Sequence, residues 1–434
     1  MKKKLRIGIY IREIFSEEGT GSFTFVNSFL QYGTRGHPRF EFCFIFNNQS
    51  SIDILRKSKD TNNVSTLKLS DYNPNEKPDI ISISLTEKLR FRLGSWVHKL
   101  AKFFFLNLEI KHPFLISDFQ QLEKQRMENL IDTNQIDLVL YPFWFDYPTI
   151  DRPFVMFYWD SAHRYLNFMP DLGSRNVEHV LIPALQNAFK VVVPNNAAIE
   201  EVESLYRIGP RSEKFSILPF SFPYYKSNDE KDSDKVCLNT LGITRPFLFI
   251  PAGFWPHKNH IVLVEALELL TERGFDLEIV ATGPNRGNLE YIRETVQRLN
   301  LENRFHYLGF VERKTLNYLY GNCVAMIFPS IVGPNNYPPI EAASLGCPVI
   351  LSDLHGHREQ MGKAALYFEK FNSLELANKV ELLLSDPNLR DDLCEKGKDL
   401  ALQASPEIYF ENLIGIFEEF STYRKMWGEN YSLK

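Results

Sequence analysis

The second half of the chain alternates short apolar runs with helix-period segments, and this alternation constrains its fold more than any other feature. The apolar runs are RPFLFIPAG (245–253), FDLEIVATG (275–283), RFHYLGF, VAMIFPS and PVILSD. Helical patterns lie between them, the first two over about 259–273 and 288–299. Apolar runs bounded by glycine and proline, with helices between them, predict βαβ units and a parallel sheet.

The first half repeats this scheme less regularly. Its strand candidates are LRIGIYI, FEFCFIF, IDLVLYPF, PFVMFYW, FKVVVP and FSILPF. The 434 residues exceed what one hydrophobic core usually spans. The sequence therefore predicts an α/β protein of two doubly wound, Rossmann-like domains facing each other across a cleft, with ligands at the carboxyl ends of the strands.

The domain boundary is predicted at YYKSNDEKDSDK (224–235), a charged stretch almost without apolar residues. This gives an N-terminal domain over 1–223, a linker over 224–235 and a C-terminal domain over 236–405. After Pro406 a helical pattern over about 407–427 occupies most of the terminal segment 406–434.

Composition excludes several classes of protein. With 44% hydrophobic and 24% charged residues and a net charge of −5, the chain resembles a soluble globular protein and gives no reason to expect nucleic-acid binding. Its five cysteines lack C-x-x-C spacing, which favours reduced thiols and a cytoplasmic location. MKKKLRIGIYI is too short for a signal peptide, and no window suits a transmembrane helix.

Lys258 is the first candidate ligand-binding residue. It lies in GFWPHKNH (253–260), directly after a predicted strand and at the start of a helix. An ammonium group beside helix N-terminal amides suits a diphosphate. The alternative interpretation is a solvated surface charge.

Glycine turns follow other predicted strands. Gly283 in ATGPNRGNLE and Gly19 and Gly21 in SEEGTGSF would let the backbone approach a ligand closely, or they form ordinary turns. SEEGTGSF lacks the full G-x-G-x-x-G of dinucleotide-binding proteins. In LGFV (308–311), which ends at Val311, the backbone is a candidate partner for the edge of a nucleobase.

WDSAHRYLNFMPD (159–171) follows a strand of the first half. It places Asp160 and His163 among aromatic residues, and two interpretations stand: a catalytic or acceptor-binding role, or a core histidine satisfied by Asp160. No cluster of histidine, cysteine and carboxylate residues has metal-ligand spacing, so no metal site is predicted.

Residues 86–108 interleave basic and aromatic side chains, with Glu87 as the single acidic residue. Such a stretch suits an anionic membrane surface, or it forms a helix whose apolar face is buried in the domain. A salt-sensitive affinity for anionic liposomes, lost when Lys99 and Lys102 become glutamate, would support the membrane interpretation.

The stretch VGPNNYPPIEAASLGCPVI (332–350) combines three prolines with two asparagines and a single carboxylate, Glu341. Prolines fix φ and remove donors, so a stiff loop is predicted before a helix that carries Glu341.

Taken together, these motifs resemble the nucleotide-sugar domain of retaining GT-B glycosyltransferases, in the large group that includes bacterial mannosyl- and glucosyltransferases of cell-surface polysaccharide assembly. The resemblance is carried by FWPHKNH, VATGPN, HYLGFV, FPSIVGPNNYPPIEAASLGCPVILSD and HREQMGKAALYFE, and it extends over about 137–405. It implies that Lys258 contacts the donor diphosphate, that Glu341 binds the ribose and that the segment around His163 lies near the acceptor and the donor sugar. In this fold the terminal helix (406–434) is expected to cross back to the first domain.

Two family residues are absent. A carboxylate expected eight positions before Glu341 is replaced by Gly333, and an arginine expected five positions before Lys258 is replaced by Gly253. Asn335 and Asn336 donate as well as accept, and we hypothesise that they hold sugar hydroxyls or a phosphate oxygen in place of the acid.

The resemblance implies a hexosyltransferase that uses a UDP- or GDP-linked sugar donor, with retention and without a metal or other cofactor. The implied acceptor is a glycan or lipid-linked molecule, and the implied location is the cytoplasm or the inner face of the membrane. The alternatives are a nucleotide-sugar epimerase-like GT-B enzyme and an inactive GT-B scaffold or binding subunit.

Overall fold

The computed structural model describes residues 4–11, 37–46, 65–68, 113–143, 150–166, 174–208, 213–219 and 238–426. The described residues up to Val155 form one compact unit, and those from Met156 onward form a second. The predicted linker (224–235), the turn with Gly19 and Gly21, and the basic-aromatic stretch (86–108) lie outside the described residues. These three assignments therefore stay predictions.

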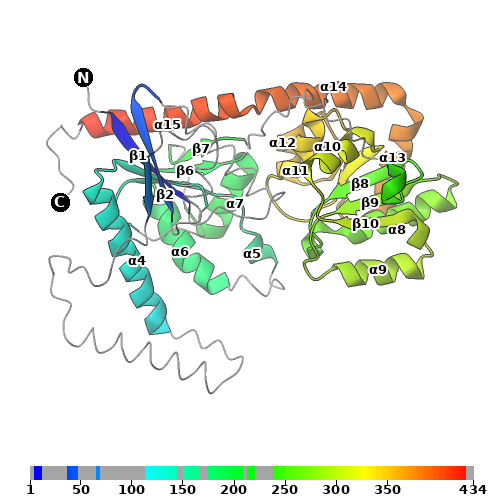
Figure 1. The fold of residues 1–434 in the computed structure, drawn as a ribbon, viewed down its shortest axis with the longest axis horizontal. Helices are drawn as coiled ribbons and strands as arrows, with labels where there is room; N and C mark the ends of the chain where they lie inside the picture. Colours follow the sequence, from blue (N-terminus) through cyan, green and yellow to red (C-terminus); the bar gives the residue numbers. More distant parts are fainter. Residues whose placement is uncertain are drawn as a thin grey trace, which may run out of the picture. The chain divides into compact units, whose positions relative to one another are not determined.

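The first sheet has seven strands in the order β3-β2-β1-β4-β5-β6-β7. Strands β1, β2, β6 and β7 of this sheet are labelled in Figure 1. Its strands are β1 (Leu5–Ile11), β2 (Phe40–Phe46), β3 (Ser65–Lys68), β4 (Leu138–Tyr141), β5 (Phe154–Phe157), β6 (Lys190–Val193) and β7 (Phe215–Ile217). The helices between them are α4 (Pro113–Thr133), α5 (Ala162–Tyr165), α6 (Ser174–Asn187) and α7 (Asn196–Tyr206). The six strands predicted for the first half are confirmed, and β3 was not predicted because its four residues are only half-buried and carry no apolar pattern.

The second sheet has six strands in the order β10-β9-β8-β11-β12-β13. They are β8 (Phe247–Pro251), β9 (Glu278–Thr282), β10 (Phe305–Gly309), β11 (Ala325–Phe328), β12 (Val349–Ser352) and β13 (Leu366–Phe368). The helices are α8 (His260–Glu272), α9 (Leu289–Arg298), α10 (Arg313–Asn322), α11 (Tyr337–Ser344), α12 (His355–Met361), α13 (Ser373–Ser385), α14 (Pro387–Gln403) and α15 (Pro406–Met426). All the strand pairings of this sheet are parallel, as predicted.

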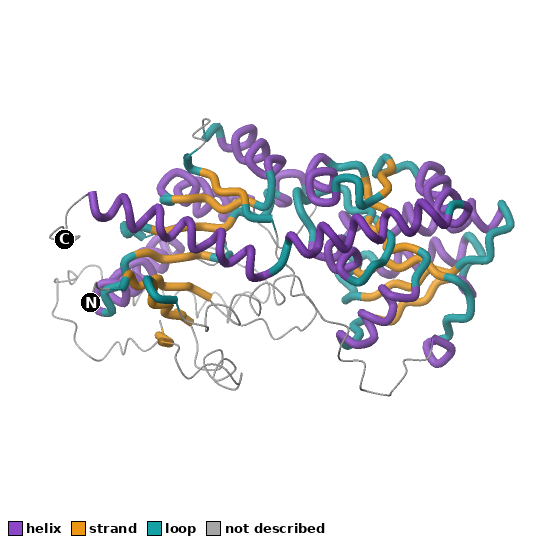
Figure 2. The backbone as a smooth tube through the Cα atoms, turned by 90° about the horizontal axis from the view of Figure 1, so that it is seen from above, coloured by secondary structure: helices purple, strands orange, loops and turns teal. Residues whose placement is uncertain are grey.

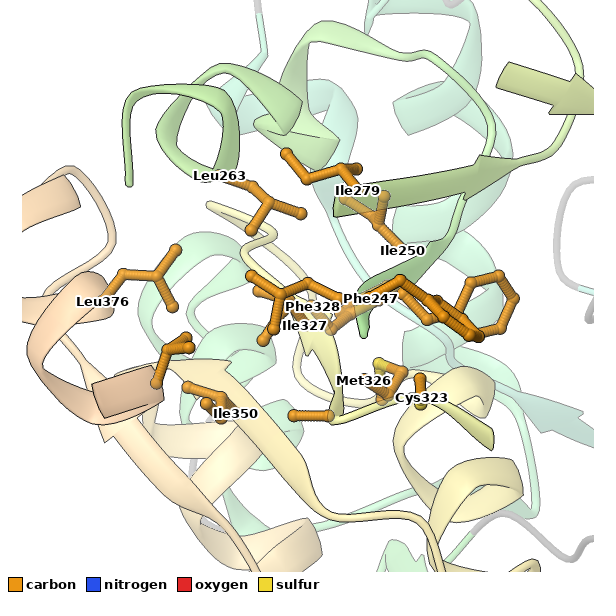
Figure 3. Packing of buried hydrophobic residues seen from close by; sticks show 14 of the residues in the cluster. Phe247, Ile250, Leu263, Ile279, Cys323, Met326, Ile327, Phe328, Ile350 and Leu376 are labelled. Carbon is orange, nitrogen blue, oxygen red and sulfur yellow. The ribbon is translucent and has the colours of Figure 1, made fainter. Parts of the chain in front are cut away.

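The core of the second sheet explains why its strands read as continuous apolar runs. Strands β9, β11 and β12 are buried at every residue, because helices cover both faces of the sheet. Helix α8 packs with α9 and α13, and α11 packs with α14. Figure 2 shows helices around the strands of this sheet. Figure 3 shows Phe247, Ile279 and Phe328 among the side chains that fill the space between them.

The strand order of the second sheet reverses between β8 and β11. From β8 the chain first adds β9 and β10 on one side, and it then crosses to add β11, β12 and β13 on the other. Open α/β sheets bind ligands at such a reversal, outside the carboxyl ends of the strands. A ligand-binding site is therefore expected among the residues that follow β8 and β11.

Helix α15 lies beside the start of β6 (Figure 1). The Phe420 ring contacts the Phe189 ring at 5.3 Å between centroids, and Glu419 forms an ion pair of 2.8 Å with Lys190 at the start of β6. This segment matches the predicted helix over about 407–427 within one residue at each end.

Candidate active site

Lys258 follows β8 and lies in the short helical turn η5 (Pro256–Lys258), just before α8 begins. Pro256 starts this turn, and Asn259 ends it in the left-handed region (φ 54°). The Lys258 Nζ atom lies 3.2 Å from Asn336 Oδ1 and 4.9 Å from the centre of the Phe328 ring. Burial lowers the pKa of Lys258 to about 8, and the Asp160 carboxylate acts in the opposite direction. The predicted position at the strand end is confirmed, and the side chain is half-buried rather than a solvated charge.

The proline-rich loop follows β11, on the other side of the strand reversal. Asn336 precedes α11 as its N-cap, and two prolines fall in the first turn, where their missing N–H groups cost nothing. Asn336 accepts from Lys258 through its side-chain oxygen, and its amide nitrogen lies 3.0 Å from His357 Nε2. The Asn335 Oδ1 atom accepts from the Asn336 backbone N–H at 2.8 Å. The structure thus joins Lys258, Asn335 and Asn336 in one hydrogen-bonded group.

The backbone conformation at Gly333 gives a physical reason for the absence of a carboxylate at this position. Its φ of 110° is one that side chains rarely adopt, and a Cβ there would lie 3.3 Å from Asn336 Nδ2. Gly253, in contrast, would place a Cβ in ordinary contact with Pro284 at 3.5 Å. The backbone therefore disfavours an acid at 333 but leaves room for a side chain at 253.

Glu341 lies inside α11 with 7% of its surface exposed. Its Oε2 atom accepts from the Tyr320 hydroxyl at 2.9 Å, and its Oε1 atom lies 3.3 Å from Arg313 Nη1. Two carboxylate oxygens offer about four lone-pair positions. Glu341 can therefore keep both partners and still accept from ligand hydroxyls.

Gly283 brings the ends of β8, β9 and β10 close together. Its φ is 120°, and a Cβ there would lie 2.7 Å from the backbone of Ala252 and Gly253. Its N–H donates to the Gly309 carbonyl at 2.7 Å. The Gly283 backbone thus lies close to the neighbouring strand ends, and its approach to a ligand stays a prediction. Val311, two residues after β10, is partly buried.

Asp160 and His163 follow β5 in the first sheet. Asp160 Oδ1 accepts from the Ala162 N–H at 2.8 Å and so stabilises the start of α5. His163 is buried, and its Nε2 atom lies 3.4 Å from both Glu178 Oε1 and the Tyr206 hydroxyl. Burial lowers the pKa of His163. This histidine contacts Glu178 and Tyr206, and the Asp160 carboxylate, its partner in the interpretation as a core histidine, also acts on its pKa.

Glu201 in α7 was not predicted and supports the same turn. It accepts from the Tyr158 hydroxyl and, at 2.6 Å, from the Ser161 N–H. Ser161 Oγ in turn lies 2.7 Å from the Tyr206 hydroxyl. Burial raises the pKa of Glu201 to about 7. No local pattern identifies Glu201, because its partners are about 40 residues away in the sequence.

The described residues contain neither a candidate metal site nor a candidate membrane span. Within those ranges, no group of three or more histidine, cysteine or carboxylate side chains could hold a metal ion. No helix in the described part of the chain is long and apolar enough to cross a membrane.

Two parallel sheets with helices on their faces, and a candidate site at the strand reversal of the second sheet, define a GT-B fold. Solved structures support this class. The crystal structure of Anabaena HepE in complex with UDP matches with a TM-score of 0.62 and 14% identity, over 96% of this chain and 100% of that chain. At this identity the likeness shows the fold alone.

Sequence comparison then gives the family. Residues 240–400 match the profile of Glycosyl transferases group 1, and this part of the chain is similar to that family. The predicted resemblance is thereby confirmed. The O-antigen chain mannosyltransferase RfbU of Salmonella typhimurium is 25% identical over 50% of this chain and 54% of its own length. A Campylobacter jejuni N,N'-diacetylbacillosaminyl-diphospho-undecaprenol α-1,3-N-acetylgalactosaminyltransferase is 25% identical over 45% of this chain and 50% of its own. The chain thus matches about half the length of these relatives.

Proposed function

We propose that the chain is a retaining hexosyltransferase that transfers a sugar from a UDP- or GDP-linked donor to a glycan or lipid-linked acceptor. The observation that carries the proposal is Lys258, held at the strand reversal of a group 1 glycosyl transferase domain and oriented by Asn336. Two relatives support the acceptor class, since one is named an O-antigen chain mannosyltransferase and the name of the other contains an undecaprenol-linked sugar. HepE, whose structure was solved in complex with UDP, supports the donor class.

The roles of the residues follow from their chemistry. Transfer with retention passes through an oxocarbenium-like state while the nucleoside diphosphate leaves, so the main requirement is a fixed positive charge at the leaving group. Lys258 supplies that charge beside the start of α8. Glu341 accepts from the ribose hydroxyls, and the acceptor hydroxyl passes its proton to the departing phosphate oxygen. Gly283 and Val311 line the nucleotide, and a metal ion is not required for these steps.

Asp160 and His163 are proposed to meet the acceptor and the donor sugar from the first sheet. Asn335 retains the greater capacity to bind a sugar hydroxyl, because both ends of the Asn336 amide already have partners in the chain. The proposal places the enzyme in the cytoplasm or at the inner face of the membrane, where residues 86–108 are the candidate lipid contact. Gly19 and Gly21 are proposed to approach the ligand from the turn after β1.

The test is a panel of UDP-, GDP- and ADP-sugars, assayed for release of nucleoside diphosphate and, by calorimetry, for binding. Lys258→Ala and Glu341→Gln are each expected to weaken binding of the accepted donor at least tenfold, the effect of losing one charge-assisted hydrogen bond of about 1.5–3 kcal/mol. Lys363→Ala and Glu395→Gln change exposed residues of the same charge and are the matched controls. The anomeric configuration of the product, read by NMR, tests retention.

The outcomes separate the rival functions. Binding of a nucleotide sugar without turnover of any donor would favour the scaffold subunit, and interconversion of donors without an acceptor would favour the epimerase-like enzyme. If nucleotide binding survived both Lys258→Ala and Glu341→Gln, the proposed site would be wrong.

A further inference from the structure

A chain of hydrogen bonds runs from Lys258 through Asn336 and His357 to the end of β12. Lys258 Nζ lies 3.2 Å from Asn336 Oδ1, and Asn336 Nδ2 lies 3.0 Å from His357 Nε2. His357 Nδ1 lies 2.8 Å from the carbonyl oxygen of Ser352. The chain thus links the strand end after β8 to that of β12 through the loop after β11.

The chemistry of the two ends fixes the direction of every bond. The Ser352 carbonyl oxygen only accepts, so His357 Nδ1 carries the proton and, in a neutral ring, Nε2 is an acceptor. Burial lowers the pKa of His357 to about 4, which keeps the ring neutral at physiological pH. Nε2 therefore accepts from the Asn336 amide nitrogen, and the Asn336 oxygen faces the Lys258 ammonium, which only donates.

A flipped amide would lose both interactions at once. Its N–H groups would face the ammonium, and its oxygen would face the lone pair of His357 Nε2. Helix α12 also holds the backbone of the same residue, since Gln360 Nε2 donates to the Asn336 carbonyl at 2.5 Å and Gln360 Oε1 accepts from its N–H at 3.2 Å. His357 and Gln360 thus fix the side chain and the backbone of Asn336 from one helix.

The charge of the group distinguishes this arrangement from one with an acid. A carboxylate beside Lys258 would form an ion pair and would oppose the approach of an anionic diphosphate. An amide oxygen orients the ammonium through one hydrogen bond and leaves its charge in place. An oriented, uncancelled cation is what a nucleoside diphosphate requires.

We propose that His357 is a positioning residue that fixes the Asn336 amide with its oxygen toward Lys258, so that the ammonium is aimed at the diphosphate without being neutralised. The proposal rests on the proposed function for the role of the diphosphate, but the orientation of Lys258 is a property of the free protein. It assigns a function to the first residue of HREQMGKAALYFE, for which the sequence analysis named no role.

The experiment measures the pKa of the Lys258 ε-amino group by NMR of 13C-labelled lysine, together with calorimetric binding of UDP and GDP. The variants are His357→Leu, His357→Gln, Asn336→Ala and the double variant His357→Leu/Asn336→Ala. Lys258→Arg identifies the resonance. His355→Gln changes a histidine of the same helix whose side chain is 57% exposed, and it is the matched control.

The pKa of Lys258 is expected near 8 in the wild type and in His355→Gln. It should fall in both His357→Leu and Asn336→Ala, because the buried ammonium loses its oriented acceptor. His357→Gln, whose amide oxygen can accept in place of Nε2, should restore it. In the Asn336→Ala background, His357→Leu should cause no further shift, since a residue that acts only through Asn336 has nothing left to orient.

Binding of UDP or GDP should weaken about tenfold in His357→Leu and recover in His357→Gln. A Lys258 pKa that is unchanged in His357→Leu, or that shifts equally with and without the Asn336 side chain, would overturn the proposal. If His357→Leu does not fold, Asn336→Ala still tests the proposal, because an unchanged Lys258 pKa in Asn336→Ala would also contradict it. Failure of the wild type to bind either nucleotide would instead count against the proposed function and would leave the pKa comparison valid.

Discussion

Gly356→Ala should break the contact that holds the proline-rich loop against α12. A Cβ at Gly356 would lie 2.0 Å from the Pro334 carbonyl oxygen and 2.5 Å from its carbonyl carbon and Cα. These are backbone atoms, so no side-chain rotation relieves the overlap, and either the loop or the helix must move. Gly356 carries no positive φ, so the expected effect is steric alone.

The cost follows from what the movement breaks. Overpacking of this kind costs about 1–3 kcal/mol. A loop that moves away instead loses the two bonds between Asn336 and Gln360, each of which contributes about 0.5–1.5 kcal/mol net, and the bond to the Lys258 ammonium, which contributes about 1.5–3 kcal/mol. We therefore expect a loss of about 2–4 kcal/mol of stability in the second sheet, accompanied by weaker binding of UDP or GDP because Asn336 no longer orients Lys258.

The assay is urea unfolding followed by fluorescence, with nucleotide binding measured on the same samples. Gly415→Ala is the matched control, because Gly415 lies in α15 with nothing within 4 Å of the added Cβ. Alanine there should stabilise the helix by up to about 1 kcal/mol. Equal midpoints for Gly356→Ala and the wild type, with unchanged binding, would refute the close approach of this loop to α12.

Three further predictions concern the same structure. Gly253→Arg should unfold at a urea midpoint near that of the wild type and bind UDP or GDP at least as tightly, whereas Gly333→Glu should lose about 1–3 kcal/mol of stability to backbone strain without gaining affinity. Urea unfolding and calorimetry distinguish the two variants, and a Gly333→Glu variant as stable as the wild type would contradict the strain at this position. The wild type should lose up to about 3 kcal/mol of stability as pH rises from 4.5 to above 7, because the raised pKa makes native Glu201 release near pH 7 a proton that the unfolded state has already lost. Glu201→Gln lacks this loss and should become more stable relative to the wild type over the same range, and a pH-independent difference between the two is the contrary result. The second sheet should lose stability as pH falls from 6.5 toward 4, because burial depresses the pKa values of three of its histidines and only the unfolded state takes up protons in this range. The slope is up to about 1.4 kcal/mol per pH unit for each histidine, and a stability that is independent of pH in urea unfolding would count against this prediction. These buried histidines are His257, His260 and His357.

Most of the second sheet could be predicted from the sequence, because strands buried on both faces are mostly apolar along their length. The runs at β8, β9 and β12 carry that signal, and the glycines and prolines that end them mark the turns. Strand β13 escaped prediction because it has only three residues, two of them half-buried, and edge positions of this kind leave no continuous pattern.

The candidate site was predicted only in part. Lys258 and Glu341 could be found because each follows an apolar run at a strand end, and Asn336 because it lies among prolines. Tyr320 and Arg313, which hold Glu341, and Glu201, which holds the turn with Asp160, could not. Their partners lie about 20 to 40 residues away, at a distance over which local periodicity carries no information.

By itself, the sequence determined which residues stand at the strand ends, because burial dictates the apolar runs and the chain must turn after each one. It also showed that an acid and an arginine are missing before Glu341 and Lys258. Only the tertiary structure showed that the left-handed backbone at Gly333 disfavours a side chain there, and that His357, which follows a different strand, contacts the Asn336 amide. The direction of a hydrogen bond depends on the partners that the fold brings together, and the sequence does not contain those distances.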